Sequence, residues 1–147
     1  MIKPTHDSSP TILVIEDNPA DIYLLRHALD QHDEDYQMMV LEDGEEAIEF
    51  VNHQRTLFET KPCVIVLDLH LPKHDGKAVL KAIRREPSTA NIQVVALSSF
   101  TAPKDEDEVR DLGVRLYTAK PSHLDDWIVL AGQILEICRE KIAPVLV

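Results

Sequence analysis

Short apolar segments alternate along this chain with stretches in which apolar residues recur every three or four positions. The clearest apolar segments, residues 11–15 (TILVI) and 63–67 (CVIVL), are continuous and rich in β-branched residues. Such runs are typical of strands buried on both faces of a sheet. Three further segments also predict strands. The five predicted strands cover residues 11–15, 37–41, 63–67, 93–97 and 114–118.

The stretches between and after these strands predict five helices. Asn18 is a favourable N-cap and Pro19 suits the first helical position, because its missing N–H costs nothing there. In the last helix, Asp125 follows Ser122 by three residues in the pattern of a capping box. The predicted helices run from residue 19 to the polar segment 30–36, over 45–54, from after 76 to near 87, over 103–111, and from 122 to about 141.

Strand and helix alternate five times without a repeat, a linker or a change of composition. This order predicts one α/β domain with a parallel sheet and helices on both faces. We expect the domain to span residues 11–141, with an N-terminal extension of residues 1–10 and an apolar C-terminal arm of residues 142–147. In such a sheet the carboxyl ends of the strands share one edge, where ligands bind. The residues that follow each strand are therefore the candidates for chemistry.

Composition narrows the class of protein. The 147 residues suffice for one hydrophobic core, and 15 Lys and Arg against 26 Asp and Glu give a formal charge of −11. This balance disfavours direct DNA binding, which requires clustered cations. No apolar run approaches the roughly 18 residues that cross a membrane, and residues 1–10 lack the apolar core of a secretory signal. We expect a cytoplasmic protein in which Cys63 and Cys138 are packed thiols.

Five polar residues follow four of the predicted strands: Glu16, Asp17, Asp68, Ser98 and Lys120. Three carboxylates brought together require either raised pKa values or a cation between them. Hard oxygen ligands favour Mg²⁺, with Mn²⁺ as a plausible substitute. Lys120 can balance the charge of a phosphoryl group, and Ser98 can donate a hydrogen bond to one of its oxygens.

Each of these residues also has an ordinary structural interpretation. Acids at positions 16 and 17 are favourable near a helix N-terminus, Asp68 can form a turn, Ser98 can be a satisfied hydroxyl, and a lysine improves solubility. Taken one at a time, the structural interpretations are the stronger ones. The occurrence of all five residues together at four strand ends nevertheless favours a functional site.

The motifs at these strand ends resemble the receiver domain of two-component response regulators, and the resemblance extends over residues 11–140. The matching segments are residues 15–17 (IED), 67–72 (LDLHLP), 75–76 (DG), 97–99 (LSS) and 113–121 (GVRLYTAKP). The resemblance implies a flavodoxin-like, doubly wound, five-stranded parallel sheet of order 2-1-3-4-5 with five helices. It also implies that the Lys120-Pro121 peptide bond is cis, as is usual in the family.

The resemblance further implies that Asp68 accepts a phosphoryl group from a phosphohistidine on a sensor histidine kinase. Asp17 and Asp68 would coordinate Mg²⁺ directly, and the backbone carbonyl of His70 would complete the protein ligands. Glu16 would act through a metal-bound water.

The other site residues hold the phosphoryl group and transmit its presence. By the same resemblance, Ser98 and Lys120 bind the phosphoryl oxygens, and Tyr117 is the aromatic switch residue. Ser98 stands where threonine is more frequent. His70 departs from the commonest residues at its position, and its side chain leans over the site from which water attacks, which affects the phosphoryl lifetime.

Within the family, the chain is most similar to single-domain regulators paired with bacterial phytochrome kinases. We expect a signalling protein that acts by protein contact or phosphorelay, or as a phosphate sink without a dedicated output. We do not expect an enzyme beyond its own phosphorylation and dephosphorylation. The main alternative is a Mg²⁺-dependent phosphatase with an aspartate nucleophile, although His70 stands where such an enzyme carries its acid–base aspartate.

The end of the chain suggests self-association. The last predicted helix carries more apolar residues than one sheet face can cover, and Pro144 ends the helix before an apolar tail. We therefore expect a homodimer built from the arm of residues 142–147 and a surplus helical stripe. That stripe consists of Trp127, Leu130, Ile134 and Ile137.

Overall fold

The computed structural model describes residues 9–53, 61–73, 75–99 and 103–142. Its five strands form one parallel sheet in the order β2-β1-β3-β4-β5, which confirms the expected doubly wound topology. The strands are β1 (Thr11–Ile15), β2 (Gln37–Leu41), β3 (Val64–Asp68), β4 (Gln93–Ser98) and β5 (Leu116–Ala119).

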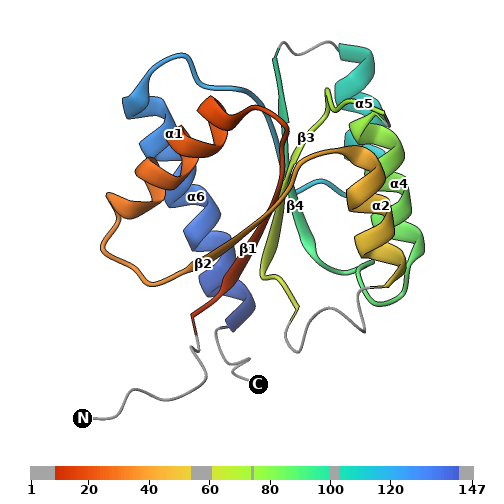
Figure 1. Cartoon of the computed structure of the whole chain (residues 1–147), viewed down its shortest axis with the longest axis horizontal. Coiled ribbons are helices and arrows are strands. Elements are labelled where there is room, and N and C mark those ends of the chain that lie inside the picture. The colour runs from red at the N-terminus through yellow and green to blue at the C-terminus, as the bar shows by residue number, and fades with distance from the viewer. Residues whose placement is uncertain (1–8, 54–60, 74, 100–102, 143–147) are drawn as a thin grey trace.

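Five helices connect and follow these strands in the part of the chain that the structure describes. They are α1 (Pro19–Asp30), α2 (Gly44–Asn52), α4 (Gly76–Arg85), α5 (Pro103–Asp111) and α6 (Leu124–Ile142). Helices α1 and α6 cover one face of the sheet, and α2, α4 and α5 cover the other (Figure 1). Alternate residues of each strand supply the two cores: Val64 and Val66 face α1 and α6, whereas Ile65 and Leu67 face the other layer.

Side-chain caps begin the helices that follow the first three strands. The Asn18 side chain accepts hydrogen bonds from the backbone of Ala20 and Asp21, which confirms the predicted cap. Asp43 and Asp75 cap α2 and α4 in the same way. Each cap closes a loop at the carboxyl edge of the sheet.

Helix α6 begins later than the capping-box pattern predicted. It starts at Leu124, and the carbonyl of His123 accepts the hydrogen bond from the Trp127 backbone N–H. His123, and not Ser122, therefore occupies the cap position.

The supposed surplus stripe of α6 is buried within the chain itself. Trp127, Leu130, Ile134 and Ile137 are each at most 5% exposed, because α6 packs against both α1 and the sheet. The prediction that this stripe is available for a partner was therefore wrong. Among the described side chains of α6, the large apolar ones that are exposed are Leu124 and Val129. Residues 143–147 of the predicted arm lie outside the described residues.

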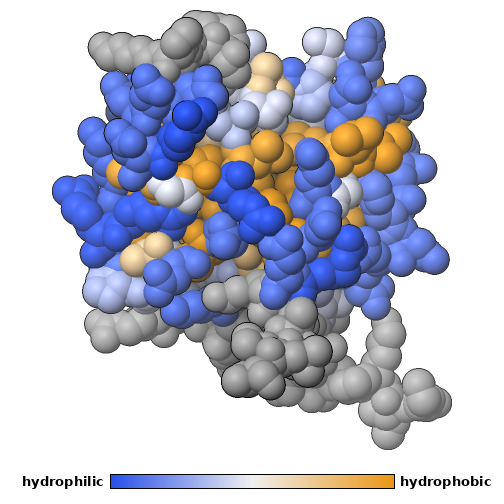
Figure 2. Space-filling view, turned by 180° about the vertical axis from the view of Figure 1, so that it is seen from behind, coloured by the Kyte–Doolittle hydropathy of each residue, from blue (hydrophilic) through white to orange (hydrophobic). Residues whose placement is uncertain are grey.

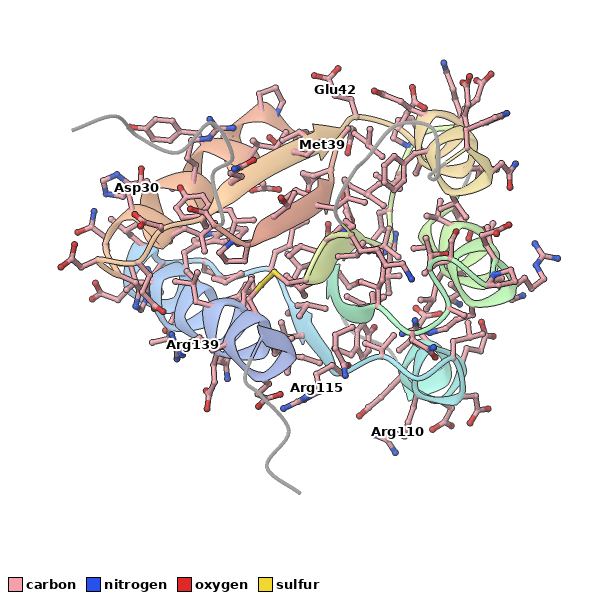
Figure 3. All side chains as sticks on the ribbon, turned by 90° about the horizontal axis from the view of Figure 1, so that it is seen from below. Asp30, Met39, Glu42, Arg110, Arg115 and Arg139 are labelled. Atoms are coloured by element: carbon pink, nitrogen blue, oxygen red, sulfur yellow. A yellow bond between two sulfur atoms is a disulfide. The ribbon has the colours of Figure 1, made fainter. Side chains whose placement is uncertain are left out.

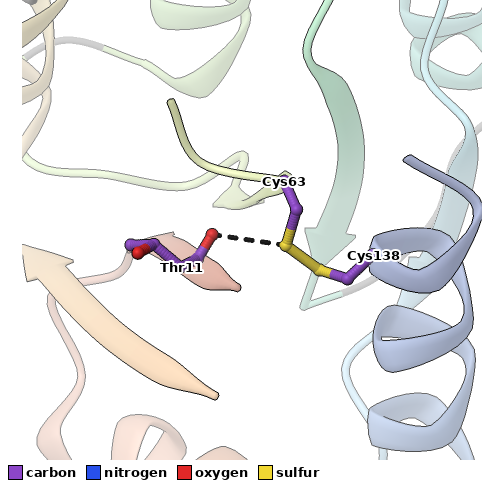
Figure 4. Close-up of a disulfide and its surroundings, with 3 residues drawn as sticks. All are labelled: Thr11, Cys63 and Cys138. Carbon is purple, nitrogen blue, oxygen red and sulfur yellow. Dashed lines mark hydrogen bonds between the residues drawn. A yellow bond between two sulfur atoms is a disulfide. The ribbon is translucent and has the colours of Figure 1, made fainter. Parts of the chain in front are cut away.

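The two cysteines form a disulfide in the structure, so the expectation of packed free thiols was wrong. Cys63 precedes β3 and Cys138 lies in α6, with their Cα atoms 5.0 Å apart and the bridge buried between the sheet and the helix (Figure 4). The two positions are 75 residues apart in sequence. The packing of α6 onto the sheet brings Cys63 and Cys138 close enough for a disulfide, which their positions in the sequence do not reveal.

Ion pairs hold the carboxyl-terminal part of α6 on either side of this bridge (Figure 3). Arg115, just before β5, forms two hydrogen bonds with the Glu140 carboxylate, at 2.8 and 2.9 Å. Arg139 pairs with Glu34 in the loop that follows α1.

Hydrophilic residues cover most of the face seen in Figure 2, with an apolar band across its middle. None of the helices formed by the described residues is both long and apolar enough to span a membrane.

Candidate functional site

The carboxyl edge of the sheet brings together residues from four strand ends around one lysine. The Lys120 ammonium lies 3.1 Å from Asp68 Oδ2 and 3.0 Å from Glu16 Oε2. The side chains of Asp68 and Glu16 are 2% and 5% exposed. The convergence expected from the sequence is therefore present in the structure.

Backbone pairing sets this arrangement. The Lys120 N–H donates a 2.7 Å hydrogen bond to the Ser98 carbonyl, which ties the end of β5 to the end of β4. Beyond Asp68, the Leu69 N–H donates to the Leu97 carbonyl at 2.9 Å. The carboxylate, hydroxyl and amine are thus fixed by the parallel register of three adjacent strands.

Three carboxylates at this edge could hold a metal ion. Oxygen atoms of Glu16, Asp17 and Asp68 all lie within 4.8 Å of one another. Glu16 and Asp68 are buried, and Asp17 is exposed, which leaves one side of the cluster open to solvent. An all-carboxylate oxygen set with solvent access fits a hard divalent cation such as Mg²⁺.

Burial and mutual repulsion perturb the ionisation of this cluster. Burial raises the pKa of the Glu16 carboxyl to about 8, a hydrogen bond and the charge of Asp68 add to the rise, and Lys120 opposes it. Although burial works to lower the pKa of Lys120, hydrogen bonds to Asp21 and Glu16 and the carboxylate charges raise it. The lysine therefore stays charged, whereas Glu16 holds its proton more tightly than an exposed carboxyl does.

Asp21 belongs to this site although the sequence reasoning did not select it. Its Oδ2 lies 2.8 Å from Lys120 Nζ, from the first turn of α1. In the sequence, an acid in the first turn of a helix is explained by the helix dipole alone. Its distance from Lys120, 99 positions later, is a product of the fold.

His70 contacts both the nucleophile candidate and the hydroxyl candidate. Its backbone N–H donates a 2.8 Å hydrogen bond to Asp68 Oδ1, and its ring Nε2 lies 3.0 Å from Ser98 Oγ. Ser98 is fully buried, whereas His70 is exposed. The ring therefore lies between the Ser98 hydroxyl and solvent.

Two further expectations concern β5 and its end. Tyr117 packs against the core under α2, α4 and α5, and its buried hydroxyl has no hydrogen-bond partner among the described residues. The predicted cis peptide at Lys120-Pro121 was wrong, because the described residues contain no cis peptide bond.

The Asp75-Gly76 motif is explained by a close backbone approach. A Cβ atom at Gly76 would lie 2.6 Å from the Asp68 carbonyl oxygen and would overlap Leu69 Cα. Gly76 N–H donates to the Leu69 carbonyl at 3.1 Å, so α4 starts directly against the loop that leaves Asp68. Only glycine allows this approach.

A parallel 2-1-3-4-5 sheet with an acidic cluster and a lysine at its carboxyl edge defines the receiver class of signalling proteins. The family model for the response regulator receiver domain matches residues 12–131. The chain therefore belongs to the response regulator receiver domain family, as its motifs predicted. Members of this family are signalling proteins and generally not enzymes.

Response regulators are among the similar proteins. The chain is 36% identical over 126 residues to response regulator Rcp1 of Synechocystis sp. (strain ATCC 27184 / PCC 6803 / Kazusa), covering 82% of this chain and 84% of Rcp1.

Solved structures agree with this assignment. The phosphorylated cyanobacterial phytochrome response regulator RcpA matches with a TM-score of 0.81 and 31% identity, over 93% of this chain and 98% of RcpA. The Mn²⁺-bound form of Rcp1 matches with a TM-score of 0.79 and 30% identity, over 93% and 99%. The bacteriophytochrome response regulator AtBRR matches with a TM-score of 0.69 and 32% identity, over 96% and 99%.

Proposed function

We propose that this chain is a response regulator that accepts a phosphoryl group on Asp68. The observation that carries the proposal is the position of Lys120, whose ammonium contacts the buried Asp68 carboxylate at 3.1 Å. A buried carboxylate can act as a nucleophile here because an adjacent cation will neutralise the charge that the incoming phosphoryl group adds.

The transfer step needs few protein groups. An Asp68 carboxylate oxygen attacks the phosphorus of a phosphohistidine, the new O–P bond forms as the P–N bond breaks, and the imidazole leaves with the electron pair of that bond. Lys120 and the Ser98 hydroxyl then bind phosphoryl oxygens. The Lys120 N–H donates a hydrogen bond to the Ser98 carbonyl, which holds the ends of β4 and β5 side by side and supports a joint role of these two residues.

A divalent ion, Mg²⁺ with Mn²⁺ as a substitute, fits the carboxylate cluster. In this proposal Asp17 and Asp68 ligate it directly, Glu16 acts through a bound water, and the His70 carbonyl supplies a backbone ligand. When bound, the ion supplies neutralisation of the phosphoryl oxygens. The Mn²⁺-bound form of the similar protein Rcp1 and the acidic cluster support this assignment.

The switch that reports phosphorylation would consist of Ser98 and Tyr117. Movement of the Ser98 hydroxyl toward the phosphoryl group would vacate space that the Tyr117 ring can occupy. The register places Tyr117 beside Ala96, on the strand that ends at Ser98. The buried Tyr117 hydroxyl has no hydrogen-bond partner among the described residues, which supports the choice of Tyr117 as the residue that moves.

A sensor histidine kinase is the expected phosphodonor, and the similarity to the phytochrome response regulator RcpA and the bacteriophytochrome response regulator AtBRR favours a phytochrome-type kinase. Output by protein contact or phosphorelay, without direct DNA binding, is consistent with the acidic net charge of −11. A cytoplasmic location remains a prediction from the sequence.

Treatment with acetyl phosphate and Mg²⁺ tests the assignment of Asp68. Intact mass spectrometry should show one phosphoryl adduct that hydroxylamine removes, as expected of an acyl phosphate. Asp68→Asn keeps the side-chain volume and should abolish the adduct, whereas the exposed Asp33→Asn should not. A hydroxylamine-sensitive adduct that persists in Asp68→Asn would refute the proposal.

We also infer a homodimer, supported now by the apolar sequence of residues 142–147 and the exposed Leu124 and Val129 of α6. Light scattering should give a dimer mass for the full chain and a monomer mass for a variant that ends at Lys141 and so lacks residues 142–147. A monomeric full chain, or a dimer that survives truncation, would contradict a role of the arm in assembly.

A further inference from the structure

The exposed side chain of His70 contacts the hydroxyl of the buried Ser98. The ring Nε2 lies 3.0 Å from Ser98 Oγ, within ordinary hydrogen-bonding distance. Ser98 is fully buried and His70 is exposed, so the ring caps the hydroxyl from outside. Nothing in the proposed phosphotransfer chemistry requires this side chain, because only the His70 backbone enters it.

The backbone of His70 is held independently of its ring. Its N–H donates a 2.8 Å hydrogen bond to Asp68 Oδ1. The ring is therefore presented to Ser98 from a backbone that is anchored on the nucleophile itself.

We propose that His70 is a positioning residue that holds the Ser98 hydroxyl in its unphosphorylated position and so opposes phosphorylation. This inference rests on the proposed function, in which Ser98 Oγ turns toward a phosphoryl group on Asp68. That turn takes the oxygen away from His70 Nε2, since a serine side chain moves between separate staggered rotamers. The phosphorylated state therefore forms only at the expense of the His70 contact.

The expected change in the phosphorylation equilibrium follows from the net free energy of one hydrogen bond. Loss of the His70 side-chain contact removes an interaction that is present only in the unphosphorylated state. The equilibrium should then shift toward the phosphorylated state by about two- to tenfold. The effect should disappear when Ser98 has no hydroxyl, because the proposal assigns it to the contact between His70 Nε2 and that group.

Beryllofluoride, a phosphoryl mimic, provides an equilibrium measurement in the full-length protein with Mg²⁺. Trp127 lines the same enclosed pocket as Glu16, Asp21 and Asp68, so its fluorescence can report binding. We expect His70→Leu to bind beryllofluoride about two- to tenfold more tightly than the wild type. His70→Gln, whose amide nitrogen can reach the position of Nε2, should return the affinity toward the wild-type value, whereas the shorter His70→Asn should resemble His70→Leu.

A double-mutant cycle makes the test specific to Ser98. In a Ser98→Ala background, His70→Leu should leave the beryllofluoride affinity unchanged. An equal or weaker affinity of His70→Leu in the wild-type background, or the same change in both backgrounds, would overturn the inference. Failure of the wild type to bind beryllofluoride, together with the absence of an Asp68 adduct, would instead overturn the proposed function.

Discussion

Lys120 Nζ lies 2.8 Å from Asp21 Oδ2, closer than its distance of 3.1 Å from Asp68 Oδ2. A residue from the first turn of α1 thus shares the lysine with the proposed phosphoacceptor. Asp21 and Lys120 are 99 positions apart in the sequence. Helix α1, which carries Asp21, lies beside α6 on one face of the sheet (Figure 1). This contact has a consequence for phosphorylation, because Asp21 competes with an incoming phosphoryl group for the same ammonium.

Asp21→Asn should therefore make phosphorylation easier. Loss of the carboxylate charge frees Lys120 and reduces the repulsion of an anionic phosphodonor. We expect the half-saturating acetyl phosphate concentration to fall by about two- to fivefold, the size of a partly screened charge interaction. Asp33→Asn removes the same charge from an exposed loop and serves as the control. An unchanged or raised half-saturating concentration in Asp21→Asn would show that the two groups do not compete.

Mg²⁺ binding should strengthen as pH rises toward 8. Burial raises the pKa of Glu16 from 4.5 to about 8, so the folded, metal-free protein retains a proton there over this range. The unfolded chain has already released that proton, and the contribution of Glu16 to the stability of the metal-free fold is therefore lost as pH rises from about 4.5 to about 8. A cation favours the deprotonated carboxylate, so its binding releases the proton.

Calorimetry at about pH 6 and about pH 8.5, in buffers of different ionisation enthalpy, measures both the affinity and the proton release. The affinity should rise by up to about tenfold per pH unit below the pKa of Glu16, with up to one proton released per ion. Glu16→Gln should remove this part of the pH dependence. A pH-independent affinity in the wild type would exclude Glu16 from the site, and an unchanged affinity in Asp17→Ala would exclude Asp17.

Gly76→Ala should damage both stability and phosphorylation. The added Cβ would press on the Asp68 carbonyl and the Leu69 backbone, which cannot move without displacing the nucleophile. We expect a loss of about 1–3 kcal/mol in the free energy of unfolding, measured by urea denaturation, and slower adduct formation. Gly132→Ala is the matched control, because the nearest obstacle there is the ring of His32, a side chain that can turn aside. Equal losses in the two variants would argue against a special requirement at Gly76.

The Cys63–Cys138 bridge should contribute a large part of the stability of the oxidised protein. A cross-link that closes a loop over a sequence separation of 75 reduces the entropy of the unfolded chain. The chain-entropy relation gives roughly 4 kcal/mol for a loop of this size. Urea denaturation with and without dithiothreitol should show this difference, and Cys138→Ser should match the reduced wild type under both conditions.

The reduced state is also compatible with the fold. Cys63 Sγ lies 3.3 Å from the Thr11 carbonyl oxygen, so a free thiol there has an acceptor (Figure 4). Because disulfides are rare in the cytoplasm, the reduced form is the state expected if the protein is located there. If the bridge forms, thiol titration of protein that is purified without reductant and then unfolded should find no free cysteine. Two free thiols together with unchanged urea curves would contradict the bridge.

The fold class and most of the site follow from the order of residues along the chain. Apolar strands such as residues 11–15 and amphipathic helices have different periods, so their alternation alone predicts a parallel doubly wound sheet. Since parallel strands end at one edge, the residues after each strand had to converge, and Glu16, Asp68 and Lys120 do so. These properties depend on local pattern and chain direction, which a single sequence contains.

Tertiary packing decided what depends on distances between elements remote in sequence. The pairing of Asp21 with Lys120 and of Cys63 with Cys138 requires the rotation and depth of helices α1 and α6 on the sheet. From the sequence, the apolar stripe of α6 that contains Ile134 is wider than one sheet face can cover. A periodic pattern shows how much of a helix surface is apolar, but not how many neighbouring elements cover that surface. In the fold α1 and the sheet cover it together, so the same residues are core. Hydrophobic burial is non-directional, and only the assembled layers determine which apolar surfaces remain for a partner.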